Sequence, residues 1–241
     1  MNISILYVAS ICSVILVLCI GYFTGYKHST LFMTQFEQTQ NKTTAIELAE
    51  QLIKKNNLLN INIIRLKSKR TNYYSFKYNV VKLSPGVINS TLLQSLAVSA
   101  NCIKDAKLSQ RKTGLYMLKI ALNIVSKLFT IIFIPIVLIC AILDTSTSSN
   151  LPALLILITL IGYLLALLIQ LILFALNLKL TNSTIKDVKS LNLLNDKEFE
   201  LFSSLCLSVC KIQFYNHTKL SLNFFSLASP DILFKQERLN Q

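Results

Sequence analysis

Three apolar stretches divide the chain, and each is a candidate for a membrane helix, although the second has a short apolar core that residues 120–126 can lengthen. Ile3–Phe23 contains 21 residues without a charge, which is about 31 Å of helix against a hydrocarbon layer of ~30 Å. Leu128–Leu143 follows Lys127, whose amine can extend toward the membrane surface. Leu151–Leu176 contains Gln170 as its one strongly polar side chain. The pattern therefore predicts a mainly α membrane protein with about three transmembrane helices.

The polar segment 24–118 has mixed helical and strand patterns. Thr44 and Glu47 have the spacing of a capping box in front of an amphipathic helix. Apolar residues then recur at helical spacing over 89–108. Between these two helices, short segments rich in β-branched and aromatic residues predict three strands, at 61–66, 72–76 and 79–83. We expect a small α+β insert that packs on the membrane helices.

The pattern predicts four consecutive regions along the chain. These are an N-terminal anchor (1–23), a cytoplasmic α+β insert (24–118), a transmembrane hairpin (119–178) and a cytoplasmic helical tail (179–241). The polar run DTSTSSN at 144–150 is suited to connect the hairpin. The start of the tail predicts two amphipathic helices, and a fourth span near 199–214 stays open as a weaker alternative.

Charge and hydropathy predict both the compartment and the orientation. Mean hydropathy is +0.54 and the net charge is +13. Fourteen Lys and Arg residues lie between Thr24 and Tyr116 and eight from Lys179 onward, whereas the N-terminal tail and 144–150 have none. The positive-inside rule then places the N-terminus outside and the basic segments in the cytoplasm. We expect an integral protein of the plasma (inner) membrane whose partners are the lipid bilayer and other membrane proteins. No basic-aromatic motif supports nucleic-acid binding.

Two cysteine arrangements are candidates for chemistry. Cys206 and Cys210 are four residues apart and share a helical face, with His217 seven residues further on. These side chains could bind a soft metal, although a buried apolar face is the favoured interpretation. Cys102 could act as a nucleophile only beside a base, and no His is near it in the sequence. The six cysteines show no disulfide framework, which favours a reducing compartment.

Several short sequence motifs occur along the chain in an order that is known from one protein family. They are Thr44, Glu47 and Ala49, the segment VVKLSPGV at 80–87, Ala97-Val98 with Ala100, and Leu168–Leu176. In this order they resemble a bacterial family of small membrane-embedded neutral zinc metallopeptidases, the YugP-like proteins. The similarity extends from the first anchor to about residue 215. It implies a zincin-like insert, zinc as the cofactor and endopeptidase activity.

The resemblance also locates the catalytic helix, and there the chain departs from the family. The family word after Ala100 is His-Glu-x-Gly-His-Ala. Here Asn101 and Asp105 stand at the two zinc-binding His positions, Cys102 stands at the position of the general base, and Lys104 replaces the Gly. The segment matches the family in its place in the chain and lacks the residues that carry the chemistry.

A third zinc ligand, a Glu, is implied where the last span ends. The best match puts Lys179 at that position, and a register two residues earlier puts Asn177 there. Before the third strand the family has an Asp-His-Tyr-Asp-Pro-like word, of which Tyr74 is retained here.

These departures argue against zinc catalysis. A catalytic zinc needs three N, O or S donors and an open position for water. We therefore predict no catalytic residue, no metal ligand and no cofactor, in a catalytically inactive peptidase relative with a binding or regulatory role. Two alternatives remain. One is an active metallopeptidase whose atypical metal site uses Asp105 with Cys206 and Cys210. The other is an unrelated small membrane structural protein.

Overall fold

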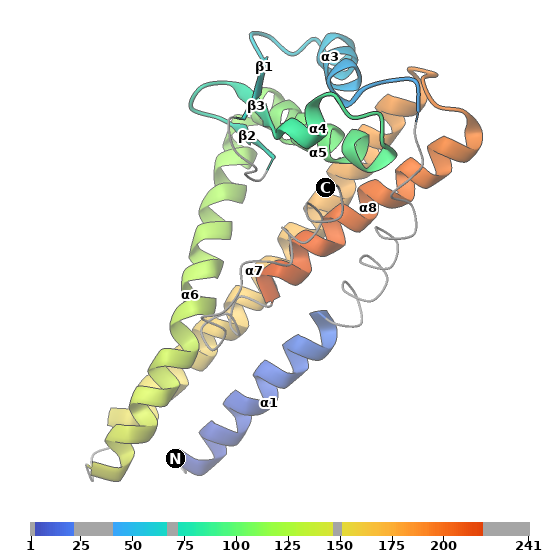
Figure 1. The fold of residues 1–241 in the computed structure, drawn as a ribbon. Coiled ribbons are helices and arrows are strands. Elements are labelled where there is room, and N and C mark those ends of the chain that lie inside the picture. Colours follow the sequence, from blue (N-terminus) through green and yellow to red (C-terminus); the bar gives the residue numbers. More distant parts are fainter. Residues whose placement is uncertain (1–2, 22–40, 67–71, 147–150, 219–241) are drawn as a thin grey trace.

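The protein is mainly helical and carries one small sheet (Figure 1). The computed structural model describes residues 3–21, 41–66, 72–146 and 151–218. In chain order the elements are α1 (Ile3–Gly21), α3 (Ala45–Lys55), β1 (Asn62–Arg65), β2 (Tyr73–Ser75), β3 (Val80–Leu83), α4 (Pro85–Ile88), α5 (Leu93–Arg111), α6 (Thr113–Ser146), α7 (Leu151–Lys189) and α8 (Asp196–Thr218).

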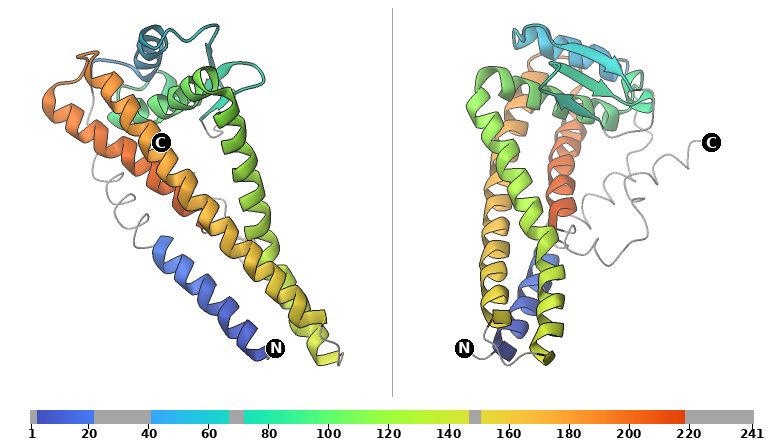
Figure 2. Two further views of the ribbon diagram at one scale, coloured as in Figure 1. Left: turned by 180° about the vertical axis from the view of Figure 1, so that it is seen from behind. Right: turned by 90° about the vertical axis from the view of Figure 1, so that its left-hand side faces the viewer.

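Two long antiparallel helices, α6 and α7, form the stem of the molecule (Figures 1 and 2). Phe133 of α6 stacks on Tyr163 of α7 with ring centroids 4.3 Å apart. Near the far end of the stem, Leu6 of α1 packs with Cys140 and Ile156. Helix α8 turns back from the head and runs along α7. The small elements α3, the sheet, α4 and α5 form a head at the opposite end from the N-terminus of α1.

Helix α7 is longer than the third apolar stretch. It continues without a break through residue 179 and ends at Lys189, so the prediction of a separate amphipathic helix at the start of the tail was wrong. No Gly or Pro interrupts this segment, and Thr181 and Thr184 are buried on one of its faces. The second predicted tail helix corresponds to α8.

The predicted start of the head is confirmed. The Thr44 hydroxyl accepts from the backbone N–H of Glu47 at 3.3 Å, and the Glu47 carboxylate accepts from that of Thr44 at 2.8 Å. This capping box satisfies two otherwise unpaired donors, so it fixes where α3 begins. Helix α5 begins four residues later than predicted, because 85–88 form a separate turn of helix and Leu92 is the residue before the first turn of α5.

The three predicted strands form one sheet in the order β1-β3-β2. Strand β1 is parallel to β3, with Ile63 opposite Val81, and β2 is antiparallel to it, with Tyr74 also opposite Val81. The Tyr74 hydroxyl reaches the Ser109 hydroxyl of α5 at 2.9 Å. This contact attaches the sheet to α5, the helix that contains the positions of the family motif.

One hydrophobic core joins the head to the stem, as predicted for the insert. It includes buried side chains from α3, β3, α5, α7 and α8, among them Leu48, Leu52, Val81, Leu96, Ile103, Val188, Phe202 and Leu205. Helix α5 lies in the middle of this core and contacts α3, α6, α7 and α8. Its position on the other helices is therefore fixed by packing on several sides.

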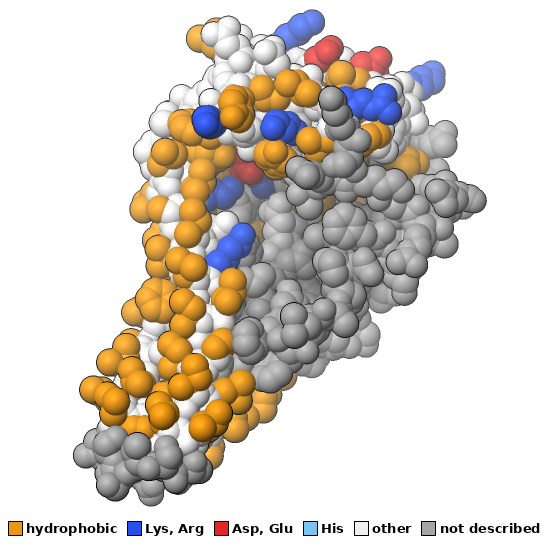
Figure 3. All heavy atoms as spheres, turned by 60° about the vertical axis from the view of Figure 1, so that its left-hand side comes forward, with side chains coloured by type: hydrophobic (Ala, Val, Ile, Leu, Met, Phe, Trp, Pro, Cys, Tyr) orange, Lys and Arg blue, Asp and Glu red, His pale blue; other side chains and the backbone are white. Residues whose placement is uncertain are grey.

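Within the described residues, two helices are long and apolar enough to cross a membrane: α6 over Thr113–Leu143, and α7. Apolar side chains cover the visible stem, whereas charged ones gather at the head (Figure 3). Helix α1 contains a shorter apolar segment, Ile5–Leu16. Within the described ranges α8 is not among the candidate spans, so the alternative of a fourth span near 199–214 gains no support. The connector was predicted at 144–150; its first three residues belong to the end of α6, and 147–150 lie outside the described residues.

Candidate functional site

The residues at the family's motif positions lie on a buried face of α5. Asn101, Lys104 and Asp105 are three and four residues apart, so they share one side of the helix. Asn101 is 7% exposed and Lys104 is 3% exposed. This face is directed toward α7 and α8, which close over it. The fold therefore places the motif at a junction of three helices.

The side-chain amine of Lys104 lies at the centre of this junction. It donates to Asn101 Oδ1 at 2.7 Å, to Thr181 Oγ1 of α7 at 3.3 Å and to Cys210 Sγ of α8 at 3.8 Å. An ammonium group has three N–H donors and no acceptor. Three acceptors from three helices thus match its three donors, and all three are uncharged.

The groups around Lys104 are also bonded to one another. Asn101 uses its amide N–H on the carbonyl of Ala97 at 3.2 Å, which orients its oxygen toward Lys104. The Thr181 hydroxyl and the Cys210 thiol are 2.9 Å apart. Each buried polar group in this cluster therefore has a partner, as interior groups require.

Asp105 does not join the Lys104 cluster. Its Oδ1 accepts from the amine of Lys119 on α6 at 2.8 Å. Asp105 instead lines a cavity of about 360 Å³ together with Asn177 and Cys210. Residues of α5, α6, α7 and α8 line this cavity, which is partly open.

The two candidate positions for the third ligand lie on different faces of α7. Asn177 lines the cavity, and its backbone carbonyl is 3.9 Å from Cys210 Sγ. Lys179 is exposed and does not line the cavity. Thr181, one turn beyond Asn177, contacts Lys104. The alignment that assigns the third ligand position to Asn177 therefore places that position beside the motif helix α5. The alternative assignment, to Lys179, stays a prediction.

Cys102 points away from this face and into the core of the head. Burial, followed by the nearby charge of Asp105, raises the pKa of its thiol to about 12. A neutral, enclosed thiol is a poor nucleophile. Burial likewise raises the pKa of Cys206, which also lies in that core. His28 and the side chain of His217 lie outside the described residues.

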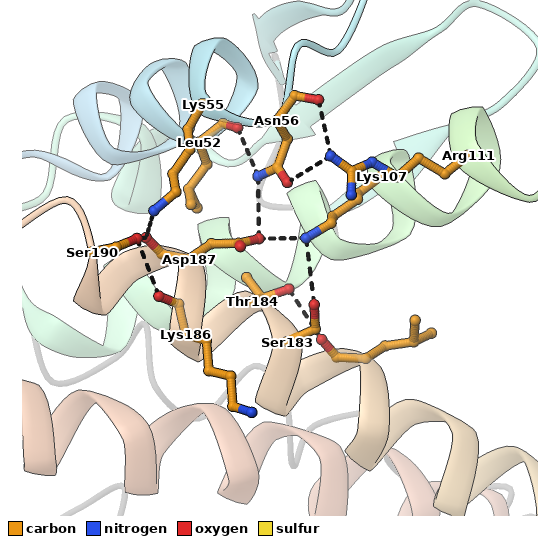
Figure 4. Close-up of polar contacts among 11 residues, drawn as sticks. Leu52, Lys55, Asn56, Lys107, Arg111, Ser183, Thr184, Lys186, Asp187 and Ser190 are labelled. Carbon is orange, nitrogen blue, oxygen red and sulfur yellow. Dashed lines mark hydrogen bonds and ion pairs between the residues drawn. The ribbon is translucent and has the colours of Figure 1, made fainter.

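A second polar cluster, which the sequence analysis missed, joins α3, α5 and α7 (Figure 4). Asp187 of α7 pairs with Lys107 of α5 and accepts from the amide of Asn56 at 3.2 Å. The Arg111 guanidinium donates to the Asn56 side chain at 3.3 Å, and Lys55 donates to the Asp187 carbonyl at 2.7 Å. One signal was present in the sequence, because Asp187 is the only acidic residue between positions 144 and 196.

The residues at the motif positions do not fit a zinc ion. They offer a neutral amide, a carboxylate already paired with Lys119, and a buried amine. A dication needs at least three suitable donors, and a neighbouring amine repels it. Among the described residues, no three His, Cys, Asp or Glu side chains could hold a metal. The alternative site of Asp105 with Cys206 and Cys210 is not assembled either, because Cys206 faces the core and does not line the cavity.

Comparison with known proteins gives one match. No curated protein and no solved structure matches the chain. A family model described as "Putative neutral zinc metallopeptidase" matches residues 9–208. The match covers most of α1, the head, both long helices and about half of α8, so the alternative of an unrelated structural protein falls away. The chain therefore belongs to the neutral zinc metallopeptidase family.

Proposed function

We propose that this protein is a membrane-bound, catalytically inactive member of the zinc metallopeptidase family with a binding or regulatory role. The observation that carries this proposal is the position of Lys104. Its amine donates to the side chain of Asn101, which stands at the first zinc-ligand position. It also donates to Thr181, which lies on α7 one turn after Asn177. A positively charged group of the protein itself thus takes a central place at the junction where the family motif lies.

The surrounding groups support the loss of catalysis. The position of the general base holds Cys102, whose thiol faces the core and has a raised pKa. A metallopeptidase also needs a base beside its metal-bound water. Asp105 is the one charged oxygen donor at the motif positions, and its ion pair with Lys119 competes with any metal. Loss of the ligands and of the general base together favours an inactive protein.

The surface of the stem supports insertion in a membrane. Along α6, large apolar side chains such as Leu128, Ile132 and Ile139 are exposed, and α7 has the same character at Leu154 and Leu165. Contiguous apolar surface of this extent is suited to lipid contact. The N-terminus of α1 lies at the end of the stem that is remote from the basic head (Figure 1). This arrangement supports a plasma-membrane orientation with the N-terminus outside and the head in the cytoplasm.

The loss of catalysis is tested by a peptidase assay on the purified full chain. An unfolded protein substrate is incubated with the wild type, with and without added zinc, and with the double variant Asn101→Ala/Asp105→Ala. We expect no hydrolysis that distinguishes the wild type from the variant. Zinc-dependent hydrolysis that the double variant lacks would overturn the proposal.

Membrane insertion is tested separately by washing membranes of producing cells with alkaline carbonate. An integral protein stays in the pellet, because apolar burial and not surface charge retains it. Release into the supernatant would contradict the membrane placement and would leave the result of the peptidase assay unaffected.

A further inference from the structure

The cavity beside the motif helix has a second polar wall, which belongs to α6. Lys119, Asn123 and Lys127 all line it and are spaced four residues apart, so they form one stripe along that helix. Gln170 lines the opposite side from α7 and donates to the Ser126 hydroxyl at 2.7 Å. The cavity thus extends from the head down into the upper part of the stem.

The charges that face this cavity sum to a positive value. Lys119 is neutralised by Asp105 at 2.8 Å. Lys127 is half-buried, and no ion pair with another described residue compensates it. A lysine inside a candidate span is costly, and such residues commonly face a binding site. Within the described part of the chain, Lys127 therefore supplies a cation without a counter-ion to the cavity wall.

The depth of the cavity matches the membrane surface. The apolar segment of α6 ends at Leu143, which lies 16 positions after Lys127, or about 24 Å along the helix. A hydrocarbon layer of ~30 Å would then extend slightly past Lys127 toward the head. Lys119 lies two turns further out. The stripe therefore crosses the level at which lipid phosphates are found.

Two further features of the wall select among anions. The side-chain oxygen of Asn177 is buried and has no hydrogen-bond partner among the residues that the structure describes, so it lacks a donor that a hydroxyl group could provide. Leu173, Phe174 and Phe214 form an apolar part of the same wall. A ligand that joins a phosphate, a hydroxyl and a hydrocarbon segment would meet all of these groups.

We propose that this cavity binds the headgroup of an anionic phospholipid that carries free hydroxyls. The phosphate pairs with Lys127, a hydroxyl donates to Asn177, and the beginning of the acyl chains contacts the phenyl rings. This inference rests on the membrane placement proposed above. It gives the inactive protein a ligand that enters from the bilayer at the junction of its four helices.

The test uses the full chain in a neutral detergent, titrated with phosphatidylglycerol and, in parallel, with phosphatidylcholine and soluble glycerol 1-phosphate. We expect saturable binding of phosphatidylglycerol, weak binding of phosphatidylcholine, and much weaker binding of the soluble ester. Lys127→Met should weaken phosphatidylglycerol binding about fivefold, and Lys127→Arg should restore it. The matched control is Lys186→Met, because that lysine of α7 is exposed, does not line the cavity, and points away from the cluster drawn in Figure 4.

Three results would overturn the inference. They are unchanged binding by Lys127→Met, an equal loss by Lys186→Met, which would indicate general surface charge, and equal affinity for glycerol 1-phosphate, which would indicate a soluble ligand. Circular dichroism of each variant verifies that it is folded. Because the binding is measured in detergent, its failure is distinct from release in the carbonate wash.

Discussion

Two lysines of α5, three residues apart, make opposite kinds of contact with the same helix. Lys107 pairs with the carboxylate of Asp187 on α7 and belongs to the cluster that joins α3, α5 and α7. Lys104 reaches α7 at Thr181 and meets only uncharged partners among the described residues. It is also the more buried of the two, at 3% exposed.

The contrast separates an ion pair between packed helices from a buried amine within the motif segment. Partly buried ion pairs such as Lys107–Asp187 are common between packed helices, because opposite charges offset part of the cost of desolvation. A buried amine with neutral partners has no such compensation. Three uncharged acceptors surround the Lys104 amine instead, and our proposal of an inactive family member interprets this cluster as the replacement of a metal site.

The largest effect is expected for Lys107→Met. The substitution leaves the partly buried Asp187 carboxylate without its cation, and we expect the free energy of unfolding to fall by about 2 kcal/mol. Urea unfolding in detergent, followed by circular dichroism, gives this value. Lys186→Met serves as the control, and a Lys107→Met loss no larger than that of the control would break the comparison.

A smaller effect is expected for Lys104→Met, the same chemical change three residues earlier. The variant leaves neutral acceptors without a donor, but it also removes the cost of burying an amine. These terms oppose each other, so we expect a loss of at most about 1 kcal/mol. A loss as large as that of Lys107→Met, measured in the same way, would contradict the proposed difference between the two clusters.

The smallest expected effect on stability at neutral pH comes from the ionisation of the Cys102 thiol. Since burial raises the pKa of this thiol from 9.0 to about 12, its contribution to stability is complete below pH 9 and is lost as the pH rises toward 12. Alkylation at pH 8, quantified by mass spectrometry, should be slow in the folded protein and fast after denaturation. Rapid labelling of Cys102 in the folded state would revive its candidacy as a nucleophile.

The sequence predicted the elements that depend on neighbouring residues. The capping box of Thr44 and Glu47 and the strand that contains Val81 follow from local patterns, and both are confirmed. The contact between Lys104 and Cys210 joins residues 106 positions apart, so no local pattern could indicate it. The same holds for Asp187, whose partners come from α3 and α5.

The end of the third apolar stretch shows a different limit. Hydropathy falls after Leu176, so the sequence suggested a boundary there. The helix continues to Lys189 because packing on α5 and α8 buries the polar residue Thr181, and tertiary contacts can override a local change of pattern. This continuation is what brings Asn177 and Thr181 opposite the motif helix.

Zinc stoichiometry of the purified full chain tests the central claim most directly. Wild type is compared with a variant that combines Asn101→His, Lys104→Ala, Asp105→His and Asn177→Glu, after incubation with excess zinc and removal of free metal. We predict far less than one zinc per chain for the wild type and an increase toward one for the variant. About one tightly held zinc per wild-type chain would contradict the account.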